Sequence, residues 1–338
     1  MRNVAQRLLN QQAASYTVTS ISGEPMARLI LIRIAISIPV LFIMTILTFL
    51  LASLVPGDAA TTILGQDATP ERIAELNAQL GLDRPIMVQY WDWLMGIFRG
   101  DLGSSIYSGE EVTRLIAQRF WPTFFLAFFA AAISAIVGVT FGIIAAVKGG
   151  WIARVLDGLG MLGISLPNFW IALLLIVYFS GTLGLFPAVG YTAPEDSFPD
   201  FLSHMVLPVA ALSFAGIALI AKQTRESMAE AMSRDFIRFM QANGIPRRQL
   251  IFKYGLRYAS IPILATISAT FITHIGGTVT LESVFAIPGM GSLVARSTTN
   301  HDLSSIQGAV LTFTIAILIV NIITDVIYSL LNPKVKAA

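Results

Sequence analysis

The stretch WPTFFLAFFAAAISAIVGVTFGIIAAV occupies residues 121–147 and contains no charged side chain. An α-helix needs about 20 predominantly apolar residues to cross the hydrocarbon core of a bilayer, and this stretch is longer than that. Its apolar residues form a nearly continuous run, whereas those of a transmembrane strand would alternate with polar ones. We therefore predict a membrane-spanning helix here, and this prediction decides the fold class.

The composition of the whole chain is also that of a membrane protein. Of its 338 residues, 55% are hydrophobic and 12% are charged, whereas a soluble domain has about 25% charged residues. Six stretches are apolar and long enough to span a membrane: 34–55, 121–147, 159–180, 205–221, 261–281 and 306–331. The fourth stretch is short and is expected to continue into the helix that follows it. We predict an all-α integral membrane protein with six transmembrane helices.

Charged residues are segregated along the chain, and this predicts its orientation. Residues 222–257 carry eight Lys/Arg against three acids, whereas residues 56–119 carry five Arg against nine acids. Six spans place the first of these segments on the same side as both termini, which are also basic. Because cytoplasmic loops are enriched in Lys and Arg, we expect the termini and residues 222–257 in the cytoplasm.

The same reading divides the chain into segments. They are an N-terminal cytoplasmic segment expected to be mobile (1–27), a first transmembrane helix (28–55), an extracytoplasmic helical segment (56–120), a five-helix core containing the basic loop 222–257 (121–331) and a cytoplasmic tail (332–338). In the extracytoplasmic segment, Thr69 and Pro70 indicate a helix start, Gly81 its end, and a second helix is expected at 85–98. No secretory signal peptide is expected, because residues 1–27 lack an apolar core segment; Met26 is an alternative start.

Signatures of catalysis and of nucleotide binding are missing. No Lys follows a Gly, so the phosphate-binding motif GxxxxGK[ST] does not occur, and neither HExxH nor GxSxG is present. The chain has no cysteine, and its three histidines lack ligand spacing. We expect no catalytic, cofactor-binding or metal site in this chain, which would not be an enzyme. Energy for any transport must then come from a partner or from an ion gradient.

Asp325 lies inside the last apolar stretch, with Asn321 one turn earlier. An acidic residue within a membrane segment suggests an ion or proton site. Asp325 is also close to the end of its span, where a packing or hydrogen-bonding role is the alternative. The sequence leaves both open.

The basic loop contains a predicted helix–turn–helix. The pattern is helical from residue 223 to 242, and one apolar stripe comprises Met228, Met232, Phe236, Phe239 and Met240. Asn243 and Gly244 end this helix, since both tolerate the left-handed conformation of a helix C-cap, and Pro246 begins the next. Such a protrusion suits a groove on another protein. The alternative is an ordinary basic loop that touches anionic lipid.

The stretch RDFIRFMQANGIPRRQLIFKYGLRYASIPIL (234–264) resembles the EAA loop of permease subunits of ATP-binding-cassette (ABC) importers, in the form used by the dipeptide/oligopeptide family. The family's three-residue head falls at 238–240 and its Gly at Gly244, while Arg257 occupies the place of a Pro and the head lacks its carboxylate. Other stretches that look like this family are LASLVPGDAA (51–60), LGLDRPIMVQYWDWL (80–94), GDLGSSIYSG (100–109), ESVFAIPGMGSLV (282–294) and TDVIYSLLNPKVK (324–336). Together the resemblance covers residues 28–336.

This resemblance implies a type I importer permease whose cytoplasmic coupling helix docks into a cleft of an ATPase. The residues that it assigns to ATPase coupling are Phe236, Arg238, Phe239, Met240, Ala242, Gly244, Ile245, Pro246, Arg247, Arg248 and Arg257. The implied partners are a second permease subunit, two cytoplasmic ATPase subunits that bind ATP and Mg²⁺, an extracytoplasmic binding protein and the lipid bilayer; nucleic acid is not expected. The implied location is the plasma (inner) membrane of a bacterium or archaeon.

The implied solutes are di- or oligopeptides, and related permeases take glutathione, nickel chelates, opines or oligosaccharides. Two other functions remain open. An ion-coupled secondary transporter would use Asp325 and would work without an ATPase. A membrane scaffold would transport nothing.

Overall fold

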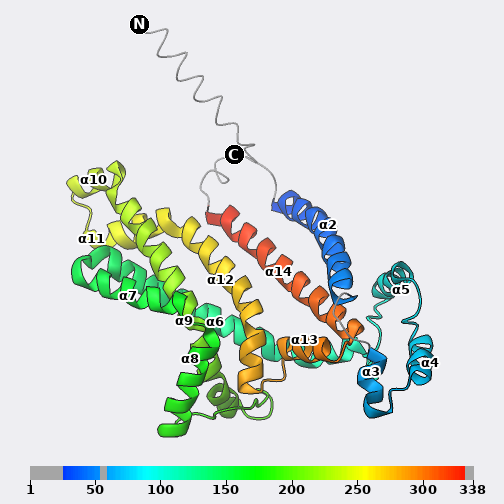
Figure 1. The fold of residues 1–338 in the computed structure, drawn as a ribbon. Coiled ribbons are helices and arrows are strands. Elements are labelled where there is room, and N and C mark those ends of the chain that lie inside the picture. The colour runs from blue at the N-terminus through cyan, green and yellow to red at the C-terminus, as the bar shows by residue number, and fades with distance from the viewer. Residues whose placement is uncertain (1–25, 54–58, 332–338) are drawn as a thin grey trace, which may run out of the picture.

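The described part of the chain, residues 26–53 and 59–331 of a computed structural model, is built from α-helices (Figure 1). The helices are α2 (Met26–Ser53), α3 (Ala59–Leu64), α4 (Pro70–Leu80), α5 (Ile86–Phe98), α6 (Val112–Lys148), α7 (Gly150–Ser165), α8 (Asn168–Leu175), α9 (Phe198–Ser233), α10 (Asp235–Ala242), α11 (Arg247–Gln249), α12 (Leu256–Phe285), α13 (Met290–Thr299) and α14 (Leu303–Leu331). Short π-helical segments, Ile176–Thr182 and Leu250–Gly255, follow α8 and precede α12. Most of the predicted N-terminal segment and all of the predicted tail lie outside the described residues.

Five helical segments of the described chain are long and apolar enough to cross a membrane. They are Ile30–Leu51, Val112–Lys148, Phe198–Ser233, Arg247–Phe285 and Leu303–Leu331. The short fourth stretch of the sequence does continue into a longer helix, because α9 contains 36 residues.

The predicted third span, 159–180, is not one straight helix. Most of the predicted residues belong to two helical segments, Ala153–Gly163 and Asn168–Thr182, which meet at an angle of 100°. The cause is Pro167, which lacks an amide hydrogen and disfavours helical geometry in the residue before it. Leu166 is accordingly extended, with φ −90° and ψ 129°. The sixth predicted span exists only if this bent pair counts as one.

The centre of the bundle is the contact between α6 and α9, and two glycines make it possible. A Cβ atom added at Gly138 would lie 2.8 Å from the Cβ of Ile220, and one added at Gly142 would lie 2.5 Å from the Cβ of Thr224. Small residues spaced four apart let two membrane helices approach closely. α6 and α9 therefore meet along a seam that admits no side chain at these positions.

At one end of the bundle, α12 turns back into α13. Ala286 ends α12 in the left-handed region, with φ +54°, and α13 begins four residues later. The buried carboxylate of Glu282 accepts hydrogen bonds from the Thr123 hydroxyl at 2.6 Å and from the Ser292 amide at 2.8 Å. This carboxylate therefore joins α6, α12 and α13, and the segment around Pro288 that links α12 to α13 is a packed corner.

The same end carries the helical cap that was predicted for residues 56–120. Thr69 caps α4, and Gly81 ends it with φ +68°; α5 coincides with the second predicted helix. The Tyr90 ring of α5 packs 5.4 Å from that of Phe49 in α2. The buried carboxylate of Asp302 accepts a hydrogen bond from the Ser105 hydroxyl at 2.5 Å. These contacts attach the cap to α2 and to the start of α14.

Candidate functional site

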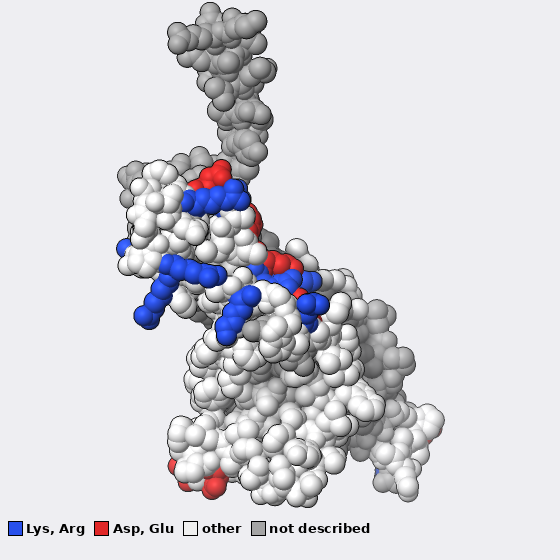
Figure 2. Space-filling model, turned by 90° about the vertical axis from the view of Figure 1, so that its left-hand side faces the viewer, with Lys and Arg blue, Asp and Glu red and all other residues white. Residues whose placement is uncertain are grey.

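The predicted coupling residues lie at the opposite end of the molecule from the cap. α10 and α11 are at the same end as the start of α2 and the end of α14 (Figure 1). Figure 2 shows the face of the molecule that lies on the left in Figure 1. Lys and Arg side chains gather over its upper part, and a broad region without charged residues lies below them. The charge segregation of the sequence is therefore also a segregation in space.

The predicted single helix over 223–242 is wrong at Arg234. This residue is extended, with φ −68° and ψ 145°, and separates α9 from α10. The predicted apolar stripe is therefore split. Met228 belongs to a buried core cluster with Ile251 and Ala259, and Met232 packs against that cluster, whereas Phe239 on α10 is 71% exposed. The turn allows α10 to bury a residue outside the predicted stripe, Ile237.

A polar and aromatic network holds α10 against α9 and α12. The Arg234 guanidinium pairs with Glu230 and lies 5.5 Å from the centre of the Tyr258 ring. The Tyr258 hydroxyl donates to Glu230 across 3.3 Å, and the ring of Phe236 lies 5.9 Å from that of Tyr258. The hydrogen bond to Glu230 raises the pKa of Arg234. Arg234 therefore stays a cation at the base of the protrusion.

The turn after α10 is a Schellman motif. The Ile245 amide donates to the Met240 carbonyl at 3.1 Å, and the Gly244 amide donates to that of Gln241 at 3.0 Å. Gly244 has φ +79°, which glycine adopts without the Cβ clash that other residues meet. The Asn243 side chain donates to the Phe239 carbonyl at 2.7 Å. The sequence prediction of a helix end at Asn243 and Gly244 is confirmed.

The arginines that follow the turn have different surroundings. Arg247 donates a hydrogen bond at 3.3 Å to the carbonyl of Val147, in the last turn of α6. Carbonyls in the last turn of a helix lack helical partners and carry partial negative charge, so this contact suits a cation. Arg248 and Arg257 are exposed, and Arg238 is 4.0 Å from Asp235 with both side chains in solvent. The structure thus ties Arg247 to α6 and leaves the other three arginines available.

Most of the predicted coupling residues lie together on one protruding surface. Met240 and Ile245 are half-buried, and the exposed members are Phe236, Arg238, Phe239, Ala242, Gly244, Pro246, Arg247, Arg248 and Arg257. Arg257 is separated from the others in the chain by the π-helical segment Leu250–Gly255, at the start of α12. The sequence reading missed Glu230, Tyr258 and Val147, because no local pattern marks residues that meet only through packing.

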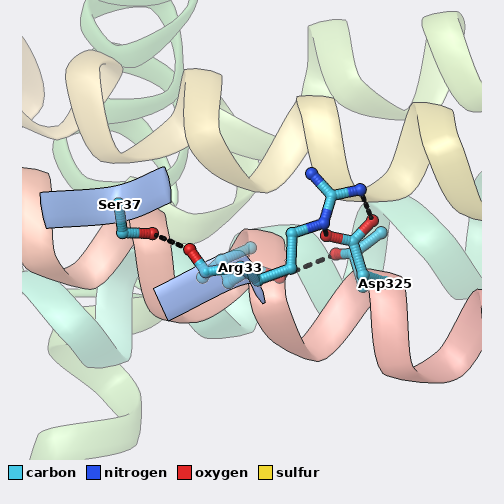
Figure 3. Close-up of polar contacts among 5 residues, drawn as sticks. Arg33, Ser37 and Asp325 are labelled. Carbon is cyan, nitrogen blue, oxygen red and sulfur yellow. Dashed lines mark hydrogen bonds and ion pairs between the residues drawn. The ribbon is translucent and has the colours of Figure 1, made fainter. Parts of the chain in front are cut away.

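Asp325 forms an ion pair with Arg33 of α2 (Figure 3). The Arg33 Nε atom is 2.8 Å from one carboxylate oxygen, and Nη2 is 3.0 Å from the other. The pair joins α2 to α14 through the two-pronged geometry that Arg and a carboxylate favour. It supports the packing alternative for Asp325 over an ion or proton site.

The histidines do not form a cluster. His274 is buried between helices, with its Nε2 atom 3.3 Å from the Ser134 hydroxyl. Within residues 26–53 and 59–331, no three His, Asp or Glu side chains are close enough to hold a metal ion.

Comparisons with known proteins cover almost the whole chain. Residues 138–337 match the family model of the inner membrane component of binding-protein-dependent transport systems, and residues 26–127 match that of the N-terminal region of such components. A protein of Brucella abortus (strain 2308) named as a peptide transport system permease is 37% identical over 92% of this chain and 99% of its own length. The glutathione transport system permease protein GsiC of Salmonella choleraesuis (strain SC-B67) is 36% identical over the same shares.

The fold is similar to that of a solved ABC transporter structure. The MetNI methionine ABC transporter, in an inward-facing conformation, matches with a TM-score of 0.51 and 17% sequence identity. The match covers 64% of this chain and 96% of that one. At this identity the similarity is one of fold.

Proposed function

This chain belongs to the family of inner membrane components of binding-protein-dependent transport systems, the permease subunits of ABC importers, and we propose that α10 and the turn after it receive the force of the ATPase subunits. The observation that carries this proposal is that α10 protrudes from the bundle with an exposed surface, while its attachment to α9 and α12 is held by side-chain contacts. Phe239 on α10 is 71% exposed, while Glu230, Arg234 and Tyr258 fix the base of the protrusion. A short helix with an exposed aromatic residue suits insertion into a groove of a partner.

Movement of this protrusion would reach the membrane helices by two routes. One runs through the chain into α9 and α12, which flank the protrusion. The other runs through the bond from Arg247 to the end of α6. Because α6 and α9 meet at Gly138 and Gly142 without room for side chains, they would move as one body. Packed helices switch between discrete arrangements, so the bundle would rock to alternate access.

The proposed assembly has the partners that this architecture requires. Two cytoplasmic ATPases bind ATP and Mg²⁺, and this chain forms half of the pore without catalysing hydrolysis. A second permease supplies the other half. An extracytoplasmic binding protein docks at the end formed by the cap and α13. Both termini then lie in the cytoplasm of a bacterium or archaeon, as the basic face around α10 supports.

The proposed solutes are di- or oligopeptides. The Brucella relative is named for peptide transport and the Salmonella relative for glutathione, and glutathione is itself a small peptide. Nickel chelates, opines and oligosaccharides are the alternatives. An ion-coupled transport mechanism is disfavoured, because the Asp325 carboxylate that it would use forms an ion pair with Arg33.

The test is Phe239→Asp in the complete importer, with Phe98→Asp as its control. Phe98 is also strongly exposed, at 78%, but ends α5 in the cap. We expect Phe239→Asp to lose ATPase subunits on purification and to lose uptake, and Phe98→Asp to keep its ATPases. Intact ATPase association and uptake in Phe239→Asp would contradict the coupling role.

A further inference from the structure

An apolar groove runs between α6, α12 and α14, away from the coupling protrusion. Its volume is about 410 Å³. One wall is a ladder of stacked rings on α6: Phe124 lies 5.9 Å from Phe120 and 5.7 Å from Phe128, with interplanar angles of 16° and 17°. Phe271 of α12 and Phe313 of α14 also line it. The groove therefore presents hydrocarbon surface over its length.

The few hydroxyl groups in this groove already have partners. Thr123 donates to Glu282 and accepts from the Met290 amide at 2.7 Å. Ser268 and Thr324 are bonded to each other at 2.7 Å. A peptide in the groove would bring amide groups that find no partner there, and burying unpaired polar groups is unfavourable. The lining therefore favours an occupant made of hydrocarbon.

Two arginines, outside the groove lining itself, belong to the same helices as lining residues at the end of the groove that is nearest the cap. Arg119 directly precedes Phe120, and Arg296 belongs to α13, whose first residue, Met290, lines the groove. Arg296 is among the charges that act on Arg119, together with Glu110 and Glu282. Glu282 is already hydrogen-bonded within the protein.

Among the described residues, neither arginine has a direct ion-pair partner, and Glu110 and Glu282 act on Arg119 only from a longer distance. In the described part of the chain neither one forms an ion pair or a side-chain hydrogen bond, and the Nε of the half-buried Arg119 is buried without an acceptor. Two cations that repel each other, one with an unpaired buried donor, are stabilised by an anion placed between them. This end of the groove is therefore suited to a negatively charged group.

We propose that the groove binds one anionic phospholipid, with a phosphate at Arg119 and Arg296 and an acyl chain along the phenylalanine ladder. The dimensions agree. Phe313 and Ile327, which both line the groove on α14, are about 21 Å apart at 1.5 Å per residue, and an acyl chain has to cover about 15 Å, half of the hydrocarbon core. Trp121, two residues after Arg119, has an exposed ring that suits the membrane–water interface, where phosphates lie.

Lipid binding can be measured on the complete importer in detergent, titrated with phosphatidylglycerol or phosphatidylcholine and analysed by native mass spectrometry. We expect the wild type to retain phosphatidylglycerol preferentially. Arg119→Gln and Arg296→Gln should each weaken its binding roughly fivefold, the contribution of one arginine near anionic lipid. Arg114→Gln is the matched control: Arg114 is exposed near the same end of α6, about 140° around the helix at 100° per residue, and its loss should leave the affinity unchanged.

A second variant tests the acyl chain. Ala316 lines the groove, and Ala316→Phe should fill it and reduce the retention of both lipids without changing the arginines. Equal retention of the two lipids by the wild type, or wild-type affinity in both arginine variants, would overturn the proposal.

The second permease is the competing occupant, and cysteine chemistry separates the two. The chain has no cysteine, so Ala316→Cys is its only thiol. If the groove holds lipid, this thiol forms no cross-link to cysteines placed along the second permease in the assembled complex. If it cross-links to a cysteine placed in the second permease, the groove is a subunit interface and the proposal fails. Neither result bears on the coupling role of α10, which is measured by ATPase association.

Discussion

Arg247 donates a hydrogen bond at 3.3 Å to the carbonyl of Val147, although the two residues are 100 positions apart in the chain. This bond connects the proposed coupling element directly to the end of α6. The helix seam at Gly138 and Gly142 then extends the connection to α9. A push on the protrusion would therefore act on three membrane helices, α6, α9 and α12.

The first prediction concerns Arg247. We expect Arg247→Gln to keep ATPase subunits bound but to reduce coupled uptake several-fold, because α6 is released while Phe239 stays in place. The hydrogen bond is exposed, so its loss should cost only about 1 kcal/mol of stability. Uptake per ATP hydrolysed in proteoliposomes is the measurement. Lys253→Gln is the control for charge, because Lys253 is exposed in the neighbouring segment Leu250–Gly255 and is not one of the coupling residues; a similar loss of coupling in that variant would show that α6 is not the route.

The second prediction concerns Gly244. An L-residue at φ +79° meets a clash between its Cβ and the backbone, so Gly244→Ala should destabilise the turn by about 1 kcal/mol. Space is not the cause, because a Cβ at this position would meet nothing within 4 Å. Gly244→Asn should cost less, since Asn tolerates this conformation. The rate of limited proteolysis within residues 235–250 measures this destabilisation. Equal protection of the wild type, Gly244→Ala and Gly244→Asn would contradict the prediction.

The third prediction compares two helical glycines. Gly142→Leu should force α6 from α9 and destabilise the fold by about 1–3 kcal/mol or more, as overpacking does. Gly276 in α12 has nothing within 4 Å of an added Cβ, so Gly276→Ala should be neutral or stabilising by up to about 1 kcal/mol. Thermal unfolding of the purified complex separates them, and equal midpoints would refute the close α6–α9 contact.

The fourth prediction concerns the pair of Arg33 and Asp325. Replacement of either residue by Ala should cost on the order of 1 kcal/mol, since Arg33 is half exposed and its pairing is partly screened by solvent. The exchange Arg33→Asp with Asp325→Arg should restore part of that stability. ATP-driven uptake should continue in the exchanged variant and in the presence of a protonophore. Uptake that stops with Asp325→Asn but not with Arg33→Ala would instead favour an ion site.

Local chemistry accounts for much that could be predicted. Pro70 and Gly81 delimit α4, and Gly244 ends α10, because proline and glycine restrict or permit particular backbone angles in themselves. The long apolar runs became α2, α6, α9, α12 and α14, since hydrocarbon core and helix rise set the required length. By contrast, the helical pattern did not reveal the break at Arg234.

What the sequence by itself determined is the class of protein: several apolar helices, a basic side, an acidic side and a basic helix–turn–helix with no nucleotide-binding motif. Only the tertiary structure decided which residues of that element face outward, that Arg247 is bound to α6 and that Asp325 is neutralised by Arg33, 292 positions away. The physical reason is the distance along the chain over which each interaction acts. Backbone propensities and hydropathy act within a few turns of the chain, whereas the partner of a charge or a ring is chosen by how whole helices pack.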